Sequence, residues 1–320
     1  MVREKLYFEC PSCSSDDLTN GESSNGIIAC RACGAEFVCK KGIPRLVNLE
    51  NYSASFGFQW NKHAKTQLDS YSGLDLSKNR VLAATGWKTL DVPHGQRILE
   101  AGSGAGRFTE VLVKTGGDIH SFDYSDAVEA NFSNNGQAKN LTLFQGDIYR
   151  IPYKDQTFDW VICLGVIQHT PDPRGAFFSL EKKVAPGGWL VIDVYTLSVH
   201  HLFQWKYFLR PITRRLPPEF LYRCLAFLIP FLLPPTRLLK LLLGRFGARM
   251  SPIVEYSGLG LGKKLNEKWA LLDSFDMYSP AHDHPQSIGT VERWFKEAGF
   301  IDINLRYGAN GIVARGRKPS

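Results

Sequence analysis

Four cysteines near the start of the chain have the spacing of a metal site. They form two C-x2-C pairs, Cys10/Cys13 and Cys30/Cys33, which sixteen residues separate. Two thiolates three positions apart can bind one side of a zinc ion, and a second such pair completes a tetrahedron. The sequence therefore predicts a structural Zn2+ site in a module over residues 1–47. A redox role is disfavoured, because no strand–helix–strand pattern surrounds either pair.

A glycine-rich turn gives the chain a second candidate site. Gly102, Gly104 and Gly106 follow directly after the short apolar run Arg97–Ala101. Glycines allow a sharp reversal and let backbone N–H groups approach a ligand closely. The spacing disfavours a dinucleotide, because Arg107 stands where that fingerprint requires its third glycine, and it disfavours a P-loop, because no Gly-Lys-Ser/Thr follows. The turn favours a nucleoside ligand that presents a carboxylate to these amides.

Two acidic residues follow neighbouring apolar runs and complete this candidate site. Asp123 ends the run 119–123, where its carboxylate can accept hydrogen bonds from both hydroxyls of a ribose. Asp147 follows the run 141–145 and can accept from an adenine amino group. Ribose, adenine and an amino-acid carboxylate together make S-adenosylmethionine, which is the cofactor that the sequence predicts.

Hydrophobic periodicity indicates the elements that position these residues. Between residues 97 and 195 apolar runs alternate with amphipathic stretches, which predicts strands at 97–101, 119–123, 141–145, 158–164 and 189–195, and helices at 108–115 and 175–184. This alternation predicts an α/β fold with a Rossmann-like, doubly wound, mostly parallel sheet and helices on both faces. A helix at 290–298 and two further strands are expected to complete the sheet.

Composition divides the chain into five expected segments. They are a zinc-ribbon module at 1–47, an N-terminal helical cover at 48–96, an S-adenosylmethionine-binding core at 97–195, a helical cap insertion at 196–286, and a C-terminal helix with strands at 287–320. With 44% hydrophobic and 22% charged residues, the chain is globular rather than disordered or fibrous. An odd number of cysteines, seven, and no apolar stretch behind Met1–Lys5 lead us to expect a cytoplasmic protein.

The cap insertion carries the basic character of the chain. Residues 202–250 hold nine Lys/Arg and one Glu, a balance of +8, so the rest of the chain nets −1 against a total of +7. We expect Pro217, Pro218, Pro230, Pro234 and Pro235 to break this segment into short helices. Its apolar run, 221–233, falls short of the roughly 18–20 residues of a membrane span. Two alternatives stay open, a membrane-surface lid for a lipid-linked acceptor and a soluble cap with its own leucine core.

Taken in order, the core motifs resemble class I S-adenosylmethionine-dependent methyltransferases of the methyltransferase domain 11 group. The resemblance rests on Leu99–Arg107, Asp123–Ser125, Gly146-Asp147, Ile151-Pro152, Phe158-Asp159, Gly165–His169 and Pro186–Gly188. It implies cofactor contacts from Glu100, Gly102, Ser103, Gly104, Gly106, Asp123, Tyr124, Ser125, Asp147, Ile148 and Leu164. The implied reaction is in-line methyl transfer to a small-molecule or lipid- or glycan-linked acceptor, driven mostly by positioning and water exclusion.

The same resemblance suggests residues on the acceptor side. His169, just beyond the fourth core strand, is the candidate general base, with packing against the cofactor as the alternative. Tyr278 and His284 are candidate acceptor contacts, in a segment similar to the family's D-x-Y-(S/A)-P-x-x-x-H pattern that also contains two further acids. Phe56 and Trp60, in a helix expected at 56–63, are candidates to face the sulfonium.

Residues 34–47 resemble small zinc-ribbon proteins that accompany some methyltransferases, which have a closing Gly-Ile-Pro strand. Ribosomal RNA guanine methyltransferases also carry such a ribbon, so an RNA base methyltransferase that contacts RNA through it is an alternative. Confinement of the basic residues to a leucine-rich insertion argues against nucleic acid as a partner. A non-catalytic scaffold with the same fold is the second alternative.

Overall fold

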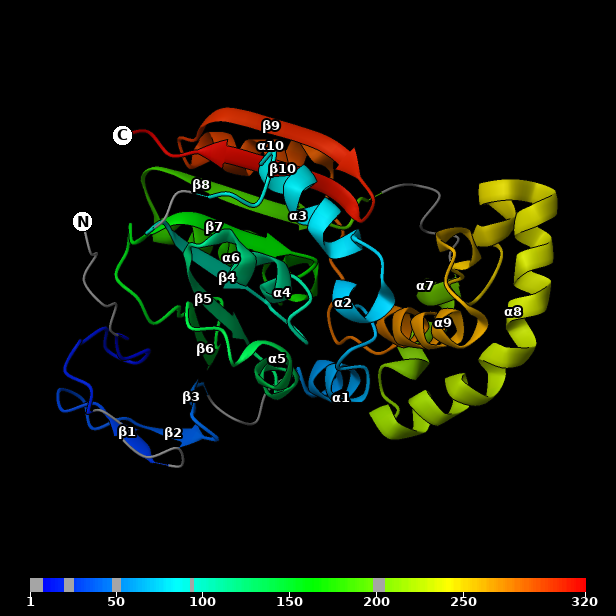
Figure 1. Ribbon diagram of the computed structural model, residues 1–320, viewed down its shortest axis with the longest axis horizontal. Helices are drawn as coiled ribbons and strands as arrows, with labels where there is room; N and C mark the ends of the chain where they lie inside the picture. The colour runs from blue at the N-terminus through cyan, green and yellow to red at the C-terminus, as the bar shows by residue number, and fades with distance from the viewer. Residues whose placement is uncertain (1–7, 20–25, 48–52, 93–94, 198–204) are drawn as a thin grey trace.

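One large sheet runs through the molecule (Figure 1). The computed structural model describes residues 8–19, 26–47, 53–92, 95–197 and 205–320, and its strands lie in the order β1-β2-β3-β6-β5-β4-β7-β8-β10-β9. The strands are β1 Ile27–Ala29, β2 Glu36–Lys40, β3 Ile43–Leu46, β4 Arg97–Ala101, β5 Asp118–Asp123, β6 Leu141–Gly146, β7 Phe158–Leu164, β8 Val184–Val194, β9 Ile301–Gly308 and β10 Gly311–Arg317.

The centre of this sheet is parallel, as the sequence predicted. β4 pairs in parallel with β5 and β7, β5 with β6, and β7 with β8. β10 and β9 close that side as an antiparallel pair. The predicted Rossmann-like, mostly parallel α/β fold is therefore confirmed. Because parallel strands all end at one edge, the loops after β4, β5 and β7 meet there.

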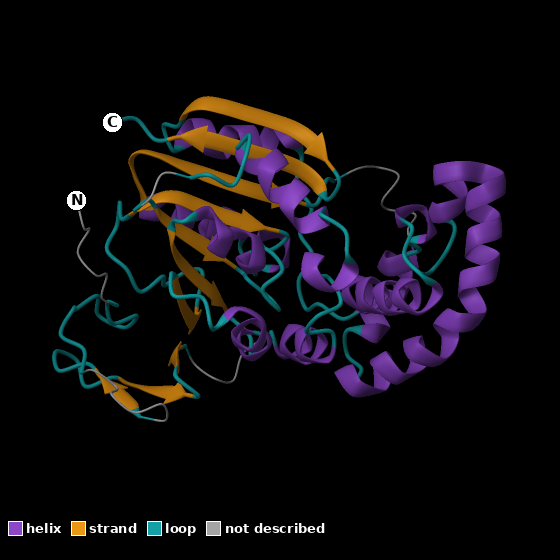
Figure 2. Ribbon diagram, in the orientation of Figure 1, coloured by secondary structure: helices purple, strands orange, loops and turns teal. Residues whose placement is uncertain are grey.

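Helices cover both faces of the sheet and gather at one end of it (Figure 2). Those described are α1 Ala54–Lys62, α2 Asp69–Ser72, α3 Leu76–Thr85, α4 Thr109–Leu112, α5 Val128–Asn135, α6 Pro173–Lys183, α7 Trp205–Thr213, α8 Pro218–Arg249, α9 Lys263–Tyr278 and α10 Ile288–Glu297. Phe177 of α6 and Phe295 of α10 belong to the apolar layer on one face. Val81 of α3 and Leu112 of α4 belong to the layer on the other, as expected where strands are buried on both sides.

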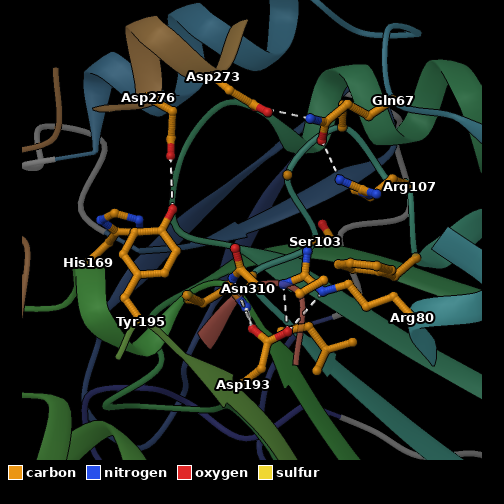
Figure 3. A pocket seen from close by; sticks show the side chains of 18 of the residues that line it. Gln67, Arg80, Ser103, Arg107, His169, Asp193, Tyr195, Asp273, Asp276 and Asn310 are labelled. Carbon is orange, nitrogen blue, oxygen red and sulfur yellow. Dashed lines mark hydrogen bonds and ion pairs between the residues drawn. The ribbon is translucent and has the colours of Figure 1, made fainter. Parts of the chain in front are cut away.

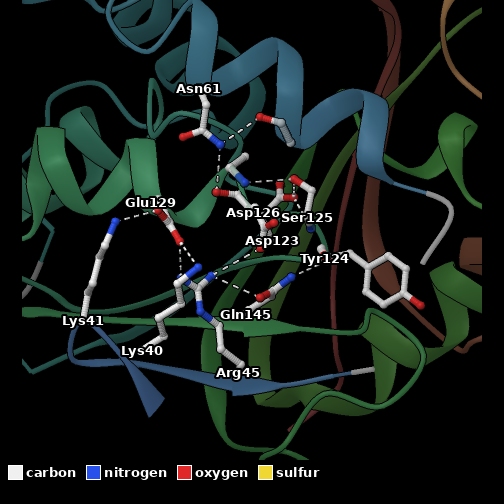
Figure 4. Close-up of polar contacts among 12 residues, drawn as sticks. Lys40, Lys41, Arg45, Asn61, Asp123, Tyr124, Ser125, Asp126, Glu129 and Gln145 are labelled. Atoms are coloured by element: carbon white, nitrogen blue, oxygen red, sulfur yellow. Dashed lines mark hydrogen bonds and ion pairs between the residues drawn. The ribbon is translucent and has the colours of Figure 1, made fainter. Parts of the chain in front are cut away.

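The cysteine-bearing module is continuous with the sheet, which the sequence analysis did not predict. β3 pairs in parallel with β6, with Arg45 opposite Gln145. The Arg45 side chain is 2% exposed, and its guanidinium donates to Gln145 Oε1 at 3.1 Å and to Glu129 Oε1 at 3.0 Å (Figure 4). Lys40 and Lys41 reach the same carboxylate of α5 at 3.2 and 2.9 Å. A buried cation and one shared carboxylate thus fix the module to the core.

α8 corrects two expectations about the cap. It continues through Pro230, Pro234 and Pro235, with non-helical backbone only at Gly244, so these prolines do not divide the segment into short helices. Apolar residues four positions apart explain this, because they keep one side of the helix packed on α9: Leu221, Leu225, Ile229 and Leu233.

The second correction concerns length. Pro218–Gly244, 27 residues with a mean hydropathy of 1.6 in its most apolar window, is long and apolar enough to cross a membrane. That window is 22% buried inside the protein. Length and composition alone are weak evidence of a span, since helices of soluble proteins pass the same test.

Replacing Arg45 by Met tests how the module is held. The variant keeps the apolar stem but removes a buried, charged donor, so we expect the free energy of unfolding to fall by about 2 kcal/mol. Lys41→Met is the matched control, because its ammonium binds the same Glu129 while 62% exposed, where ion pairs contribute little. Urea unfolding followed by fluorescence measures both, and equal losses would contradict the role assigned to Arg45.

Candidate active site

A cavity of about 970 Å³ lies at the carboxyl edge of the sheet. Its floor comes from the loops after β4, β5 and β7, and its other walls from α1, α3, α9 and the turn between β9 and β10. Figure 3 shows Asp273 and Asp276 of α9 on the side opposite Ser103 and Asp193. A cavity of this size at this edge is where an α/β sheet binds its ligands.

The glycine turn after β4 adopts the left-handed backbone that its glycines allow. Gly102 and Gly104 have φ angles of +78° and +52°, a region that favours glycine. A Cβ atom on Gly104 would lie 3.2 Å from the Trp60 ring, so α1 packs directly on the turn. The N–H groups of Gly102 and Ser103 donate to Phe122 O at 2.8 and 2.9 Å. The turn is therefore pinned between β5 and α1.

Asp123, at the end of β5, joins the two loops at the cavity floor. One carboxylate oxygen accepts from Gly104 N at 2.8 Å. The other accepts from Ser125 N at 2.8 Å and from Ser125 Oγ at 2.6 Å (Figure 4). Burial raises the pKa of Asp123 above its usual value, although the hydrogen bonds from Ser125 and Gly104 oppose this rise. The carboxylate is thus held in one orientation before any ligand arrives.

The structure brings together most of the predicted cofactor residues. Those that line the cavity are Gly102, Ser103, Gly104, Asp123, Tyr124, Ile148 and Leu164. The other four are not among its lining residues. Glu100 is buried in β4, Gly106 packs against Asn131 and Asn135 of α5, Ser125 holds Asp123, and Asp147 precedes Ile148.

Three buried polar atoms on the lining residues have no hydrogen-bond partner within the described part of the chain. They are Ser103 Oγ on the floor, Gln59 Oε1 on α1 and Trp269 Nε1 on α9, and each residue is less than 5% exposed. Buried polar groups in proteins are almost always paired, so such atoms indicate where a ligand would bind. One hydroxyl that can donate and accept, one acceptor and one donor therefore remain for a polar ligand in this cavity.

His169 lines the cavity at the end of the 3₁₀ turn Ile167–His169. Its ring lies between Phe56 and Tyr195, with centroids 5.2 and 5.3 Å away. Nδ1 is 3.1 Å from the carbonyl oxygen of His282. Because a carbonyl only accepts, Nδ1 carries the hydrogen of the neutral ring, which leaves Nε2 with a free lone pair. The ring is held by a tilted contact with Phe56 and an edge-on contact with Tyr195, and it can act as a base through Nε2.

The two acids of α9 form the cap side of the cavity. Asp273 and Asp276, three positions apart, share one helix face. Asp273 accepts from Gln67 Nε2 at 3.1 Å and from the Tyr256 hydroxyl, and Asp276 accepts from the Tyr195 hydroxyl at 3.3 Å (Figure 3). Burial raises the pKa of Asp273 to about 6, and Asp276 adds to that rise. Here the sequence analysis noted two acids without assigning them a contact.

The sequence analysis assigned no role in the cavity wall to two arginines that line it. Arg80 of α3 binds Asp193 of β8 through Nε at 2.9 Å and Nη2 at 2.6 Å, and Asp193 also accepts from Gly165 N at 2.5 Å. Arg107 donates to Gln67 Oε1 at 2.5 Å, and burial lowers its pKa to about 10. Nothing in the apolar sequence of β8 indicated that its carboxylate, Asp193, would bind an arginine. The sequence analysis considered Arg107 only because it stands where the dinucleotide fingerprint has a glycine.

Tyr278 and His284, the predicted acceptor contacts, are not among the residues that line the cavity. Tyr278 is 2% exposed in the apolar core of the cap, and its hydroxyl donates to Pro252 O at 2.6 Å. His284 is exposed, with its N–H bonded to Gln168 O at 2.8 Å and its ring stacked on that of His282. Their role stays a prediction that this geometry does not support.

The four cysteines of the N-terminal module converge. The Sγ atoms of Cys10, Cys13, Cys30 and Cys33 all lie within 4.8 Å of one another. The Cys10–Cys33 and Cys13–Cys30 pairs are 3.7 and 3.6 Å apart. Thiolates bound tetrahedrally to zinc at their usual bond length would be about 3.8 Å apart. The donor set and its spacing therefore fit one zinc ion.

Glu100 gives this site a pH dependence that can be measured. Burial raises the pKa of its carboxyl from 4.5 to about 7, although Thr109 and Ser121 donate to it at 2.5 and 2.7 Å. The folded protein then holds a proton that the unfolded chain has lost, so stability falls as the pH rises from 4.5 to about 7. We expect Glu100→Gln to remove about 3 kcal/mol of that fall.

Unfolding free energies of the wild type and Glu100→Gln, measured across this pH range, test the expectation. Asp273 also has a raised pKa but is present in both proteins, so its contribution cancels in the comparison. If the unfolding free energies of the two proteins changed with pH in parallel, the raised pKa of the buried Glu100 would be contradicted.

Comparison with known proteins agrees with this geometry. Residues 99–192 match the methyltransferase domain family. The chain is 30% identical over 98 residues to a ubiquinone biosynthesis O-methyltransferase of Coxiella burnetii, covering 30% of this chain and 42% of that protein. It is 26% identical over 118 residues to a sterol 24-C-methyltransferase of Gibberella zeae, covering 33% and 31%. The chain thus spans less than half the length of these relatives.

Solved structures are similar only at low sequence identity. A phosphoethanolamine N-methyltransferase of Haemonchus contortus in complex with S-adenosyl-L-methionine is 13% identical with a TM-score of 0.48, over 89% of this chain and 62% of that one. The matched residues 99–192 are those that form β4 to β8 and the floor of the cavity. Residues 99–192 are therefore similar to a methyltransferase domain.

Proposed function

We propose that the protein is an S-adenosylmethionine-dependent methyltransferase that acts on a small-molecule or lipid- or glycan-linked acceptor. The observation that carries the proposal is the cavity floor, where a tight glycine turn and the oriented Asp123 carboxylate lie beside the unpartnered Ser103 hydroxyl. That set offers the Ser103 hydroxyl to an amino-acid carboxylate, and the Asp123 carboxylate to ribose hydroxyls.

The residues of the floor fit this cofactor. Gly102, Ser103 and Gly104 would hold its amino-acid part, Asp123 its ribose, and Tyr124 and Ile148 the sides of its adenine, near Asp147. When bound, the cofactor supplies an electrophilic methyl group on a sulfonium. Phe56 and Trp60 of α1 also line the cavity, where their rings exclude water and favour a cation.

The rest of the wall suits an acceptor that carries a hydroxyl or amine. Asp273, Asp276 and Gln59 Oε1 offer acceptors for its hydrogens, and Trp269 Nε1 offers a donor. His169 Nε2 is the proposed base that removes the proton from the attacking atom. The matched relatives are named for ubiquinone biosynthesis and for sterol methylation, which supports a small-molecule acceptor over RNA.

We further propose that Cys10, Cys13, Cys30 and Cys33 bind a structural zinc ion. The module they belong to is too small to form a large core of its own, so the metal would fold it. Arg45 and β3 then connect the folded module to α5 and β6. We also propose that the enzyme is cytoplasmic, which agrees with seven cysteines that form no disulfide bond. Residues 202–250 would make peripheral contact with a membrane.

Variants of His169 and Asp273 test the proposed catalytic arrangement. Tritium transfer from methyl-labelled S-adenosylmethionine into an extract of cells that lack the enzyme measures turnover, and calorimetry measures cofactor affinity. We expect His169→Ala to lower turnover by about a hundredfold or more, as for the loss of a general base, and to leave the affinity nearly unchanged. Equal losses of turnover and affinity would show that His169 only packs against the cofactor.

Asp273→Asn is the companion variant for the acceptor side. It keeps the size of the side chain and removes a charge that binds the acceptor rather than the cofactor. We expect turnover at low extract concentration to fall and to recover at high concentration, with cofactor affinity unchanged. A fall that no extract concentration restores would make Asp273, rather than His169, the better candidate base.

Removing zinc tests the N-terminal module. We expect one zinc ion per chain by elemental analysis, and hydrogen exchange after chelation to show loss of protection confined to residues 8–47. Cofactor affinity should be retained, because the cavity takes no residue from that module. Absence of metal from the purified protein, or loss of cofactor binding together with the metal, would contradict a purely structural zinc site.

A further inference from the structure

α8 presents an apolar face on each of two sides. Its inner face, Leu221, Leu225, Ile229 and Leu233, is at most 7% exposed and packs with Phe275 and Tyr278 of α9. The other side faces away from the protein, and in Figure 1 α8 lies at the far end of the molecule from the zinc module. The inner face therefore forms the leucine core that was expected of a soluble cap, whereas the outer side of the helix does not.

The outward side of α8 is unusually apolar for a protein surface. The large hydrophobic residues that it exposes form a set that we call the outer face: Phe220 53%, Phe227 69%, Leu228 44%, Phe231 67%, Leu238 56%, Leu241 82%, Leu242 69%, Leu243 48% and Phe246 68%. No charged residue occurs between Cys224 and Thr236. Contiguous exposed apolar patches of this kind mark a surface that another phase or molecule covers.

The charges beside the outer face indicate what covers it. Arg237 and Lys240 both pair with Glu255, at 3.4 and 2.8 Å, so one carboxylate offsets part of their charge. Arg214, Arg215 and Arg223 are exposed, and no salt bridge to them occurs within the described ranges. Arg223 lies on α8, and Arg214 and Arg215 lie shortly before it in the chain. Exposed cations on and before an apolar helix are complementary to an anionic lipid surface.

The packing of the inner face argues for a helix that lies in the membrane surface rather than across it. A spanning α8 would have to leave α9 and expose Leu225, Ile229 and Leu233, which form the core of the cap. An interfacial helix buries only one side, by roughly 5–10 Å, and can keep the other side on the protein. The non-helical backbone at Gly244 also interrupts the segment near its end.

We propose that the outer face of α8 binds the surface of membranes containing anionic lipids and so holds the protein at the bilayer. This inference rests on the proposed function for its purpose, since an enzyme held there can reach an acceptor that is dissolved in or anchored to lipid. The binding itself does not depend on methyl transfer and can be measured separately.

Flotation of the full-length protein with vesicles is the direct test. We expect it to float with vesicles of phosphatidylcholine mixed with phosphatidylglycerol, and much less with phosphatidylcholine alone. The variant Phe227→Ser/Phe231→Ser/Leu238→Ser should lower partitioning by more than about tenfold, because each side chain loses its transfer into the lipid. The variant Arg214→Gln/Arg215→Gln/Arg223→Gln should lower partitioning by roughly fivefold per cation removed, and only on the vesicles that contain phosphatidylglycerol.

Ile27→Ser/Tyr307→Ser is the matched control, because these side chains are 58% and 63% exposed on β1 and β9, outside the cap. An equal effect of this control would overturn the assignment to α8, and so would failure of the wild type to float. A dimer by light scattering that the Phe227/Phe231/Leu238 variant abolishes, without flotation, would assign the outer face to a second copy of the chain.

Calorimetric titration with S-adenosylmethionine separates this inference from the proposed function. All three variants should keep the affinity of the wild type, because none of the changed residues lines the cavity. Cofactor binding without flotation would overturn the membrane inference alone. Flotation without cofactor binding would overturn the proposed function and leave the membrane surface supported.

Discussion

The Asp123 carboxylate is the contact on which the rest of the site depends. It accepts from the amide of Gly104 on one oxygen and from Ser125 on the other, so it joins the turn after β4 to the loop after β5. Without that link the ligand would have to orient the Asp123 carboxylate and the loop after β5, at an entropic cost for each residue that is fixed. With it, the cavity floor is organised beforehand, and binding energy is available for orientation.

The cap completes a cavity that the sheet alone leaves open. α9 faces in two directions, with Asp273 and Asp276 toward the cavity and Phe275 and Tyr278 toward α8. The same helix therefore connects the polar wall of the site to the apolar packing of the cap. α8 in turn has its inner face on α9, which explains how a long, largely exposed apolar helix stays attached to a globular protein.

Much of this fold could be predicted from local sequence. The first and fourth core strands have the predicted bounds, because an apolar run that ends in glycine or at a polar residue is a local signal. The pairing of β3 with β6 could not be predicted in this way, because Arg45 and Gln145 are 100 positions apart and neither residue alone indicates the other. Likewise, proline signals misled at α8, where packing of the inner face outweighs the loss of backbone hydrogen bonds.

The acceptor side shows a similar limit. Tyr278 was chosen from a motif, but it lies two residues beyond Asp276 and so on nearly the opposite side of α9. Helical register, rather than residue type, decides which of these side chains meets the cavity. For Arg80 and Asp193 no local pattern existed, because one lies on a helix and the other in an apolar strand.

Calorimetric titration of the zinc-loaded protein with S-adenosylmethionine, repeated with Asp123→Ala, tests the central claim most directly. The account predicts binding of one molecule per chain to the wild type and an affinity at least about tenfold lower for the variant, since charged hydrogen-bond partners are lost. No heat and no thermal stabilisation with the wild type, or an affinity that Asp123→Ala leaves unchanged, would contradict it.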